Sequence, residues 1–200
     1  MKFVRVLFIV LTFVSEQVSA MEIGLKAAYR DTFLPIGNGI NDSSDRIRDD
    51  RSLYGGAFSL LLKNEQNKLE LRYSSLLSDH KVSSDSYSSL LESYGLSYYF
   101  SFSDAKASKF YFFSRYELST FTLESKSSGN KKKQSLSSID IGGELEHYIV
   151  PQFISFSGEF GVKTFINRKD LTIDNISYRA SEVHSAINPF VQISFSVYFE

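Results

Sequence analysis

The chain has 200 residues, a net charge of −1, no cysteine, and a 15% share of aromatic residues that are all Phe or Tyr. A near-neutral charge argues against a nucleic-acid binder, and the lack of cysteine excludes a cysteine nucleophile and cysteine-ligated zinc or iron–sulfur sites. After residue 20 there is no apolar run of about 18 residues, so no transmembrane helix is expected.

The first twenty residues have the three parts of a secretory signal peptide. Lys2 and Arg5 supply positive charge, residues 6–14 form a short apolar core, and Val18–Ala20 has the small residues of a cleavage site. The alternative is an N-terminal membrane anchor, for which this core is short. We therefore expect cleavage after Ala20 and one mature domain, residues 21–200.

The rest of the chain repeats segments in which apolar and polar residues alternate, a pattern that predicts strands. Eight are expected: Glu22–Tyr29, Leu53–Lys63, Lys68–Leu77, Ser88–Phe102, Lys109–Leu123, Ser135–Val150, Phe153–Phe165 and Asn188–Phe199. Long polar connections (30–52, 78–87, 124–134 and 166–187) alternate with short turns (64–67, 103–108 and 151–152). An even strand number with long and short loops at opposite ends is typical of bacterial outer-membrane barrels.

The last strand gives the clearest alternation. Val191, Ile193, Phe195, Val197 and Phe199 share one face, and the residues between them, which are polar or Tyr, share the other. About ten residues is the length that a tilted strand needs to cross a bilayer.

We therefore predict an all-β fold, an eight-stranded antiparallel up-and-down transmembrane β-barrel. A soluble lipocalin-like barrel and a β-sandwich also alternate apolar and polar residues, so alternation does not exclude them. Aromatic residues near the short turns, including Tyr98–Phe102 and Phe110–Phe113, predict a girdle at one membrane interface. The alternative for them is ordinary packing in a β-rich core.

The polar face is rich in Gly and Ser with isolated charges, which suits a narrow interior filled by side chains. The charges assigned to an interior ion-pair network are Lys26, Glu70, Arg72, Arg115, Glu117, Asp140, Glu144, Glu146, Glu159 and Lys163. Because charges in a low-dielectric lumen must be paired or hydrated, we expect a plugged barrel. The alternative is a narrow or gated ion path.

Three histidines limit the catalytic options. His147 is expected on the apolar face near the Pro151 turn, whereas His80 and His184 fall in long connections. His184 and Ser185 are neighbours, which point to opposite faces if extended, so no converging Ser–His pair is found. We expect no enzyme, catalytic residue, metal or cofactor, with a lipid A-modifying enzyme as the least favoured alternative.

Two polar connections have binding potential. Residues 41–51 carry several Asp but lack the glycine and terminal Glu of an EF-hand, and arginines interleave with them. Lys126, Lys131, Lys132 and Lys133 form a basic cluster that suits lipopolysaccharide phosphates or acidic host glycans. For both segments the alternative is a solvated loop without a ligand.

Over residues 21–200 the chain resembles small eight-stranded outer-membrane proteins of the OmpA/OmpX-like β-barrel superfamily. The hairpin pattern, the signal peptide and the closing segment Val191–Glu200 carry this resemblance, although family members commonly end in the aromatic residue itself rather than in a residue such as Glu200. It implies a monomer in the outer membrane of a Gram-negative bacterium, with partners in lipopolysaccharide, the barrel-assembly machinery and a host or matrix ligand bound by the long loops. The implied role is envelope-structural and surface-exposed, with a narrow channel for small solutes as the alternative.

Overall fold

The computed structural model describes residues 21–32, 53–82, 85–102, 107–167, 171–173, 176–178 and 188–199. These residues form the strands β1 (Glu22–Thr32), β2 (Leu53–Lys63), β3 (Asn67–Val82), β4 (Asp85–Phe100), β5 (Ser108–Ser125), β6 (Lys131–Val150), β7 (Ile154–Phe165), β8 (Leu171–Ile173), β9 (Ile176–Tyr178) and β10 (Asn188–Phe199). The described residues contain no helix long and apolar enough to cross a membrane. The expected signal peptide and residues 41–51 lie outside the described ranges.

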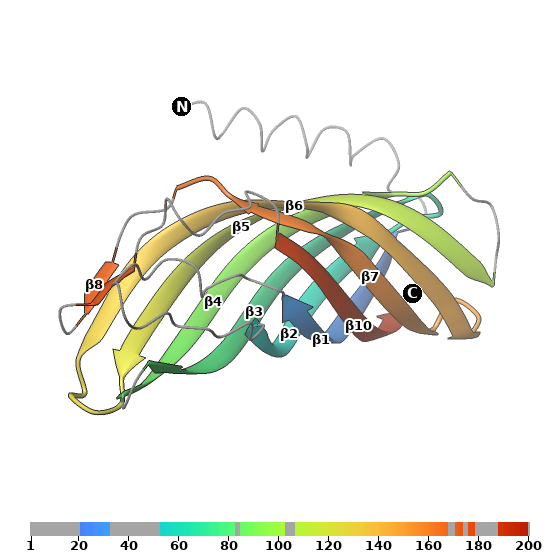
Figure 1. Cartoon of the computed structure of the whole chain (residues 1–200). Coiled ribbons are helices and arrows are strands. Elements are labelled where there is room, and N and C mark those ends of the chain that lie inside the picture. Colours follow the sequence, from blue (N-terminus) through green and yellow to red (C-terminus); the bar gives the residue numbers. More distant parts are fainter. Residues whose placement is uncertain are drawn as a thin grey trace.

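Eight strands close into a barrel in the order β1-β10-β7-β6-β5-β4-β3-β2, and every neighbouring pair is antiparallel (Figure 1). The seam joins the first and last strands, where Gly24 pairs with Tyr198 and Ala27 with Phe195. The short hairpin β8–β9 is a separate sheet. This closed up-and-down topology confirms the predicted fold and excludes the β-sandwich.

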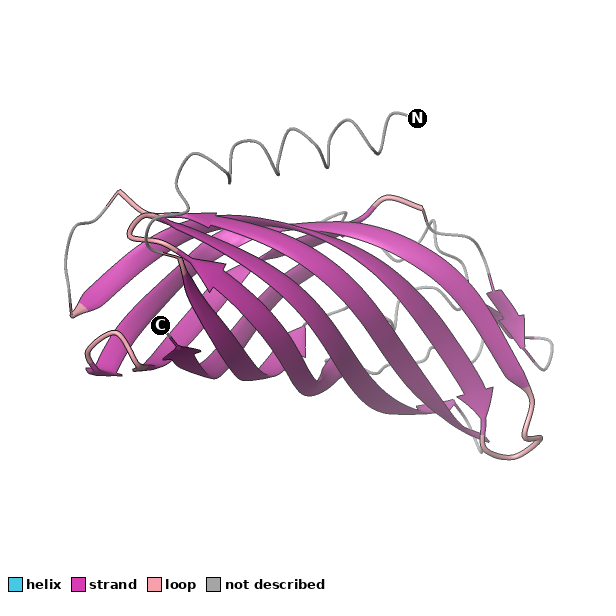
Figure 2. Ribbon diagram, turned by 180° about the vertical axis from the view of Figure 1, so that it is seen from behind, coloured by secondary structure: helices cyan, strands magenta, loops and turns pink. Residues whose placement is uncertain are grey.

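The wall of the barrel is polar inside and apolar outside. On β5 the inward side chains of Arg115, Glu117 and Ser119 are buried, whereas the alternate Tyr116 and Leu118 are exposed on the outer surface. A soluble lipocalin-like barrel has the opposite arrangement, because its interior must hold the apolar core. The polarity of the wall therefore excludes the lipocalin-like barrel. The strands are strongly tilted relative to the barrel axis (Figure 2).

The barrel has two unlike ends. Residues 64–66, 101–107 and 151–153 connect strands at one end, called the turn end, where the terminal strands also begin and finish. At the other, the extended end, β3 to β6 continue beyond their last pairs with β2 and β7 (Figure 1). We call these prolonged parts the extension; its residues are Ser78–Val82, Asp85–Ser89, Ser119–Ser125 and Lys131–Ser137.

The prediction is wrong for two of the four long connections. The segments 78–87 and 124–134 are mostly strand, because β3 runs to Val82, β4 begins at Asp85, β5 runs to Ser125 and β6 begins at Lys131. The outward side chains of the extension are Ser, Thr, Lys and acidic residues, so apolar alternation stops while backbone pairing continues. At the tip, Gly129 adopts a φ of 72°, which favours glycine.

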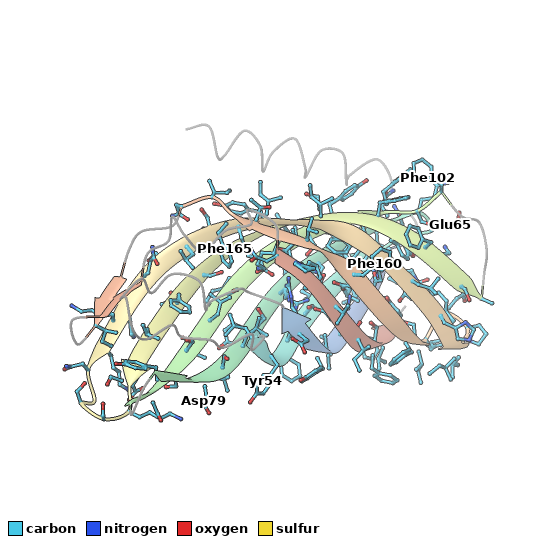
Figure 3. The ribbon with its side chains drawn as sticks, in the orientation of Figure 1. Tyr54, Glu65, Asp79, Phe102, Phe160 and Phe165 are labelled. Carbon is cyan, nitrogen blue, oxygen red and sulfur yellow. The ribbon has the colours of Figure 1, made fainter. Side chains whose placement is uncertain are left out.

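The aromatic residues near the turn end divide between the two faces of the wall. Those exposed on the outer surface are Tyr98, Phe102, Phe112, Phe153 and Phe199, and Figure 3 labels Phe102 at this end. Those buried in the lumen are Tyr99, Tyr111, Phe113 and Tyr148. The first group has the outward position that the predicted girdle requires, whereas the second group packs among the interior charges.

At the extended end the lumen is closed by apolar side chains. The cluster contains Leu53, Leu76, Tyr87, Leu91, Phe121, Leu123 and Leu136 from the barrel strands, together with Ile173 of β8 and the partly buried Phe165. Ile173 is only 3% exposed. The hairpin β8–β9 therefore contributes one apolar side chain, Ile173, to the cluster that fills this end of the lumen.

Candidate functional site: the charged lumen

The middle of the lumen is filled with ionised side chains. All ten residues that the sequence assigns to the interior are buried: Lys26, Glu70, Arg72, Arg115, Glu117, Asp140, Glu144, Glu146, Glu159 and Lys163. The structure adds Arg30, Lys63 and Lys68, which sequence reasoning missed. The alternation along each strand could have identified them: Arg30 is an even number of residues from Lys26, and Lys68 from Glu70 and Arg72, so each shares the inward face.

Two lysines from different strands share one carboxylate. Lys26 Nζ on β1 lies 2.9 Å from Glu144 and 2.5 Å from Glu159, which belong to β6 and β7. Lys68 on β3 binds the second oxygen of Glu144. These contacts cross the lumen rather than following the sheet, so the charges connect opposite walls of the barrel.

A second group lies closer to the extended end. Arg30 donates to Glu117 at 3.2 Å and to Asp140 at 2.8 Å. Lys163 binds the other oxygen of Glu117 and lies 3.3 Å from Asp140. Each carboxylate of this group is therefore held between two cations.

Arg115 joins the two groups. Its Nη2 atom donates to Glu70 at 3.2 Å, to Glu159 at 2.9 Å and to the hydroxyl of Tyr99 at 2.8 Å. Its Nη1 atom lies 3.5 Å from Asp140. A guanidinium with several fixed donors suits this position, since a lysine has one flexible ammonium group.

Tyrosine rings close the lumen towards the turn end. Lys63 Nζ lies 4.4 Å from the ring centroid of Tyr148 and 4.3 Å from that of Tyr198, within the range of cation–π attraction. Its carboxylate partner is Glu22, at 3.4 Å. The charged centre is thus bounded by aromatic side chains at one end and by the apolar cluster at the other.

The described residues contain no catalytic constellation. His147 is exposed on the outer wall near the turn end, as expected, and its Nδ1 lies 2.8 Å from Ser108 Oγ. No acidic side chain is among the hydrogen-bond partners of His147 in the described ranges, and no group of three or more metal-binding residues occurs in the described part of the chain. The backbone of His80 lies in β3, whereas His184 is outside the described ranges.

The four lysines of the basic cluster are exposed, although three of them lie in a strand. Lys126 occupies the turn after β5, and Lys131, Lys132 and Lys133 begin β6. Lys126 pairs with Asp79 at 2.8 Å, and Lys131 with Glu124 at 2.9 Å. Figure 3 labels Asp79 near this end of the barrel. Two of the four charges are therefore neutralised within the extension.

The outer wall carries an apolar groove of about 660 Å³ over β1, β2, β3, β4 and β10. Ala27 is one of its lining residues, and the larger side chains of Leu25, Phe58 and Phe195 line it too. Phe58 is 70% exposed, which is unfavourable in water and suited to contact with hydrocarbon.

No protein-family model matches the sequence, and no curated protein matches it. Among solved structures, the Neisserial surface protein A (NspA) aligns with a TM-score of 0.56 and 13% identity over 90% of this chain and 97% of that chain. A major outer membrane protein of Thermus thermophilus aligns at 0.57 and 10% identity, over 90% and 100%. Ail, the attachment invasion locus protein of Yersinia pestis, in complex with the heparin analogue sucrose octasulfate, aligns at 0.50 and 9% identity, over 90% and 97%.

The fold is that of a small outer-membrane β-barrel. At such low identities the likeness concerns the fold alone. The chemistry of this barrel depends on its own residues. Its lumen holds thirteen buried charged side chains.

Proposed function

We propose that this chain is a non-enzymatic integral protein of the bacterial outer membrane, with a closed lumen and an extension displayed at the cell surface. The observation that carries the proposal is the polarity of the wall, which has an apolar outer surface and an interior whose buried charges are mostly paired. On β6 the outward apolar residues run from Ile139 to Ile149, a span that matches the roughly 9–11 residues that a tilted strand needs.

The turn end then faces the periplasm and the extension faces outward. This orientation places short turns inside and prolonged strands outside, as in other barrels of this class. The signal peptide of residues 1–20, insertion by the barrel-assembly machinery and a monomeric state belong to the same proposal. Contact with lipopolysaccharide follows from the position of the extension above the outer leaflet.

The first test is the gel mobility of the protein from an outer-membrane fraction in SDS, with and without boiling. A closed barrel satisfies its backbone groups internally, so the unboiled protein should migrate differently from the boiled protein. Recovery from the soluble periplasm, or one mobility under both conditions, would contradict membrane insertion.

A channel for small solutes is the main competitor. In the structure most interior charges bind one another, and both ends of the lumen are filled by apolar or aromatic side chains. We therefore expect no steady conductance when the purified protein is inserted into planar bilayers. Stable conductance steps would replace the closed-lumen proposal by a channel.

Surface binding of a polyanion has a weaker basis. Lys132 and Lys133 are exposed on the first part of β6, and neither has an ion-pair partner among the described residues. The Ail structure contains a heparin analogue, so sulfated and phosphorylated glycans are suitable probes. The Lys132→Glu, Lys133→Glu double variant should lose binding of heparin or lipopolysaccharide if this proposal holds, and unchanged binding would reject it.

Lipid A modification is the least supported activity. The test is to replace His80 and His184 by alanine and compare the lipid A profiles of the cells. We expect no change, and an altered profile would show that the barrel is an enzyme.

A further inference from the structure

One cation of the lumen differs from all the others that the structure describes. Arg72 on β3 is only 4% exposed. Its Nε, Nη1 and Nη2 atoms are buried and have no hydrogen-bond partner among the described residues. Each of the remaining lumen cations lies within 4.0 Å of at least one carboxylate oxygen; they are Lys26, Arg30, Lys63, Lys68, Arg115 and Lys163.

The carboxylates near Arg72 already have other partners. Glu70 accepts hydrogen bonds from Ser59, Tyr99 and Arg115. Glu159 accepts from Lys26 and Tyr99 on one oxygen and from Arg115 on the other. Arg72 is therefore close to negative charge that is directed at other donors.

Other cations face the same region. Arg30 and Arg115 are fully buried in the same lumen, and their positive charges repel that of Arg72, whereas Glu70 and Glu159 attract it. Repulsion among guanidinium groups in a poorly solvated space is costly. Arg72 therefore has like charges as well as carboxylates around it, and none of its guanidinium nitrogens has an acceptor among the described residues.

The side chains around Arg72 on the wall are small. In the strand register Arg72 lies opposite Ser59 of β2 and Gly95 of β4. One step towards the extended end, Ser93 pairs with Ser119, and their hydroxyls lie 2.7 Å apart. The neighbourhood thus combines a guanidinium that lacks acceptors with small side chains; the hydroxyl proton of Ser59 is used by Glu70, and the Ser93–Ser119 pair has one hydroxyl proton left to donate.

We propose that the lumen binds a small monovalent inorganic anion, of the size of chloride or bromide, at Arg72. A guanidinium has five N–H donors and stays charged in proteins, so it needs acceptors in a buried site. An anion supplies these acceptors and also offsets the repulsion from Arg30 and Arg115. The apolar and aromatic ends of the lumen favour a small ion over a large oxyanion.

The test uses the folded full-length mature barrel in detergent. Its thermal unfolding is followed in sodium chloride and in sodium gluconate at equal ionic strength, because gluconate is too bulky for the lumen. An anion that binds only the native state raises the unfolding midpoint in a saturable way. We expect this rise in chloride, no comparable rise in gluconate, and no rise in chloride for Arg72→Met.

The matched control is Lys126→Met, which removes an exposed cation from the turn after β5 and should keep the chloride response. If Arg72→Met does not fold, crystals of the unaltered protein soaked in bromide provide the second measurement. Anomalous scattering within contact distance of the Arg72 guanidinium supports the site. Equal responses to chloride and gluconate, or only water beside Arg72 in the bromide crystals, would overturn the proposal.

Discussion

Arg115 illustrates how much one side chain can hold together in this lumen. It is fully buried, and it binds carboxylates of β3 and β7 as well as the hydroxyl of Tyr99. A buried ion pair adds little net stability over apolar residues of the same shape, but removal of one partner leaves the other charge without compensation. The cost of losing Arg115 therefore comes from the carboxylates that remain.

We expect Arg115→Met to lower the free energy of unfolding by about 3–5 kcal/mol, because Glu70 and Glu159 lose a charged donor. Urea-induced unfolding from lipid vesicles measures this loss. The control is Lys126→Met, which breaks a largely exposed ion pair and should cost about 0–1 kcal/mol. Equal losses in the two variants would show that the lumen charges are hydrated rather than paired with each other.

The sequence predicted which charged residues lie in the lumen better than it predicted which of them form ion pairs with each other. The parity of residues along each strand placed ten charges inside, because a strand alternates between two faces. Arg30 was missed because the predicted first strand ended one residue earlier. Which cation meets which carboxylate depends on the closure of the barrel, as with Lys26 and Glu144, which are 118 residues apart in the chain, and no local pattern contains that information.

At the scale of strands, a pair of glycines makes room for the aromatic side chains of the lumen. Gly142 of β6 pairs with Gly161 of β7. A Cβ atom added to Gly142 would lie 2.1 Å from the carbonyl oxygen of Phe160 and 2.9 Å from the ring of Phe113. Neither the backbone nor a packed ring can move freely, so this position requires glycine.

We expect Gly142→Val to destabilise the barrel by at least about 1–3 kcal/mol, the usual cost of overpacking. The measurement is the fraction of protein that reaches the heat-modifiable form during refolding. Gly158 of β7 is the control, since a Cβ there meets nothing within 4 Å and Gly158→Val should refold like the unaltered protein. Normal refolding of Gly142→Val would mean that β6 and β7 are further apart than described.

The strands themselves were predictable where apolar side chains cover the outer wall. The bounds of β2 and β10 match the prediction, and in β10 apolar residues alternate along most of the strand. The extension was mistaken for loops because its outward residues face water and its polar side chains resemble those of a loop. The lysines at the start of β6 also suit an edge strand, since charge there discourages pairing with another chain.

For the whole molecule, the important property is where along the barrel axis the outward side chains change from apolar to polar. Ile141 and Ser135 face outward from the same strand, but Ile141 is within the apolar part of the wall and Ser135 is in the extension. The two positions therefore test one residue type in two environments on one face of β6.

Ile141→Arg should cost about 2–4 kcal/mol in vesicles, as expected for a charge on the lipid face near the bilayer midplane. Ser135→Arg should cost little, because its side chain is surrounded by water. Folding titrations into phospholipid vesicles compare the two variants. Similar stabilities for both would indicate that the apolar wall is not immersed in lipid.

The seam between β1 and β10 has a consequence for how the barrel can be assembled. The side chains of Lys26 and Arg30 lie on the inner face of β1, and their carboxylate partners belong to β5, β6 and β7 rather than to β10. A shift of β1 by one residue would turn Leu25 into the lumen and place both cations in lipid. A misaligned seam leaves anions unpaired inside the barrel and places cations on its apolar outer surface, so the correct register of the first strand is specified by carboxylates on three other strands.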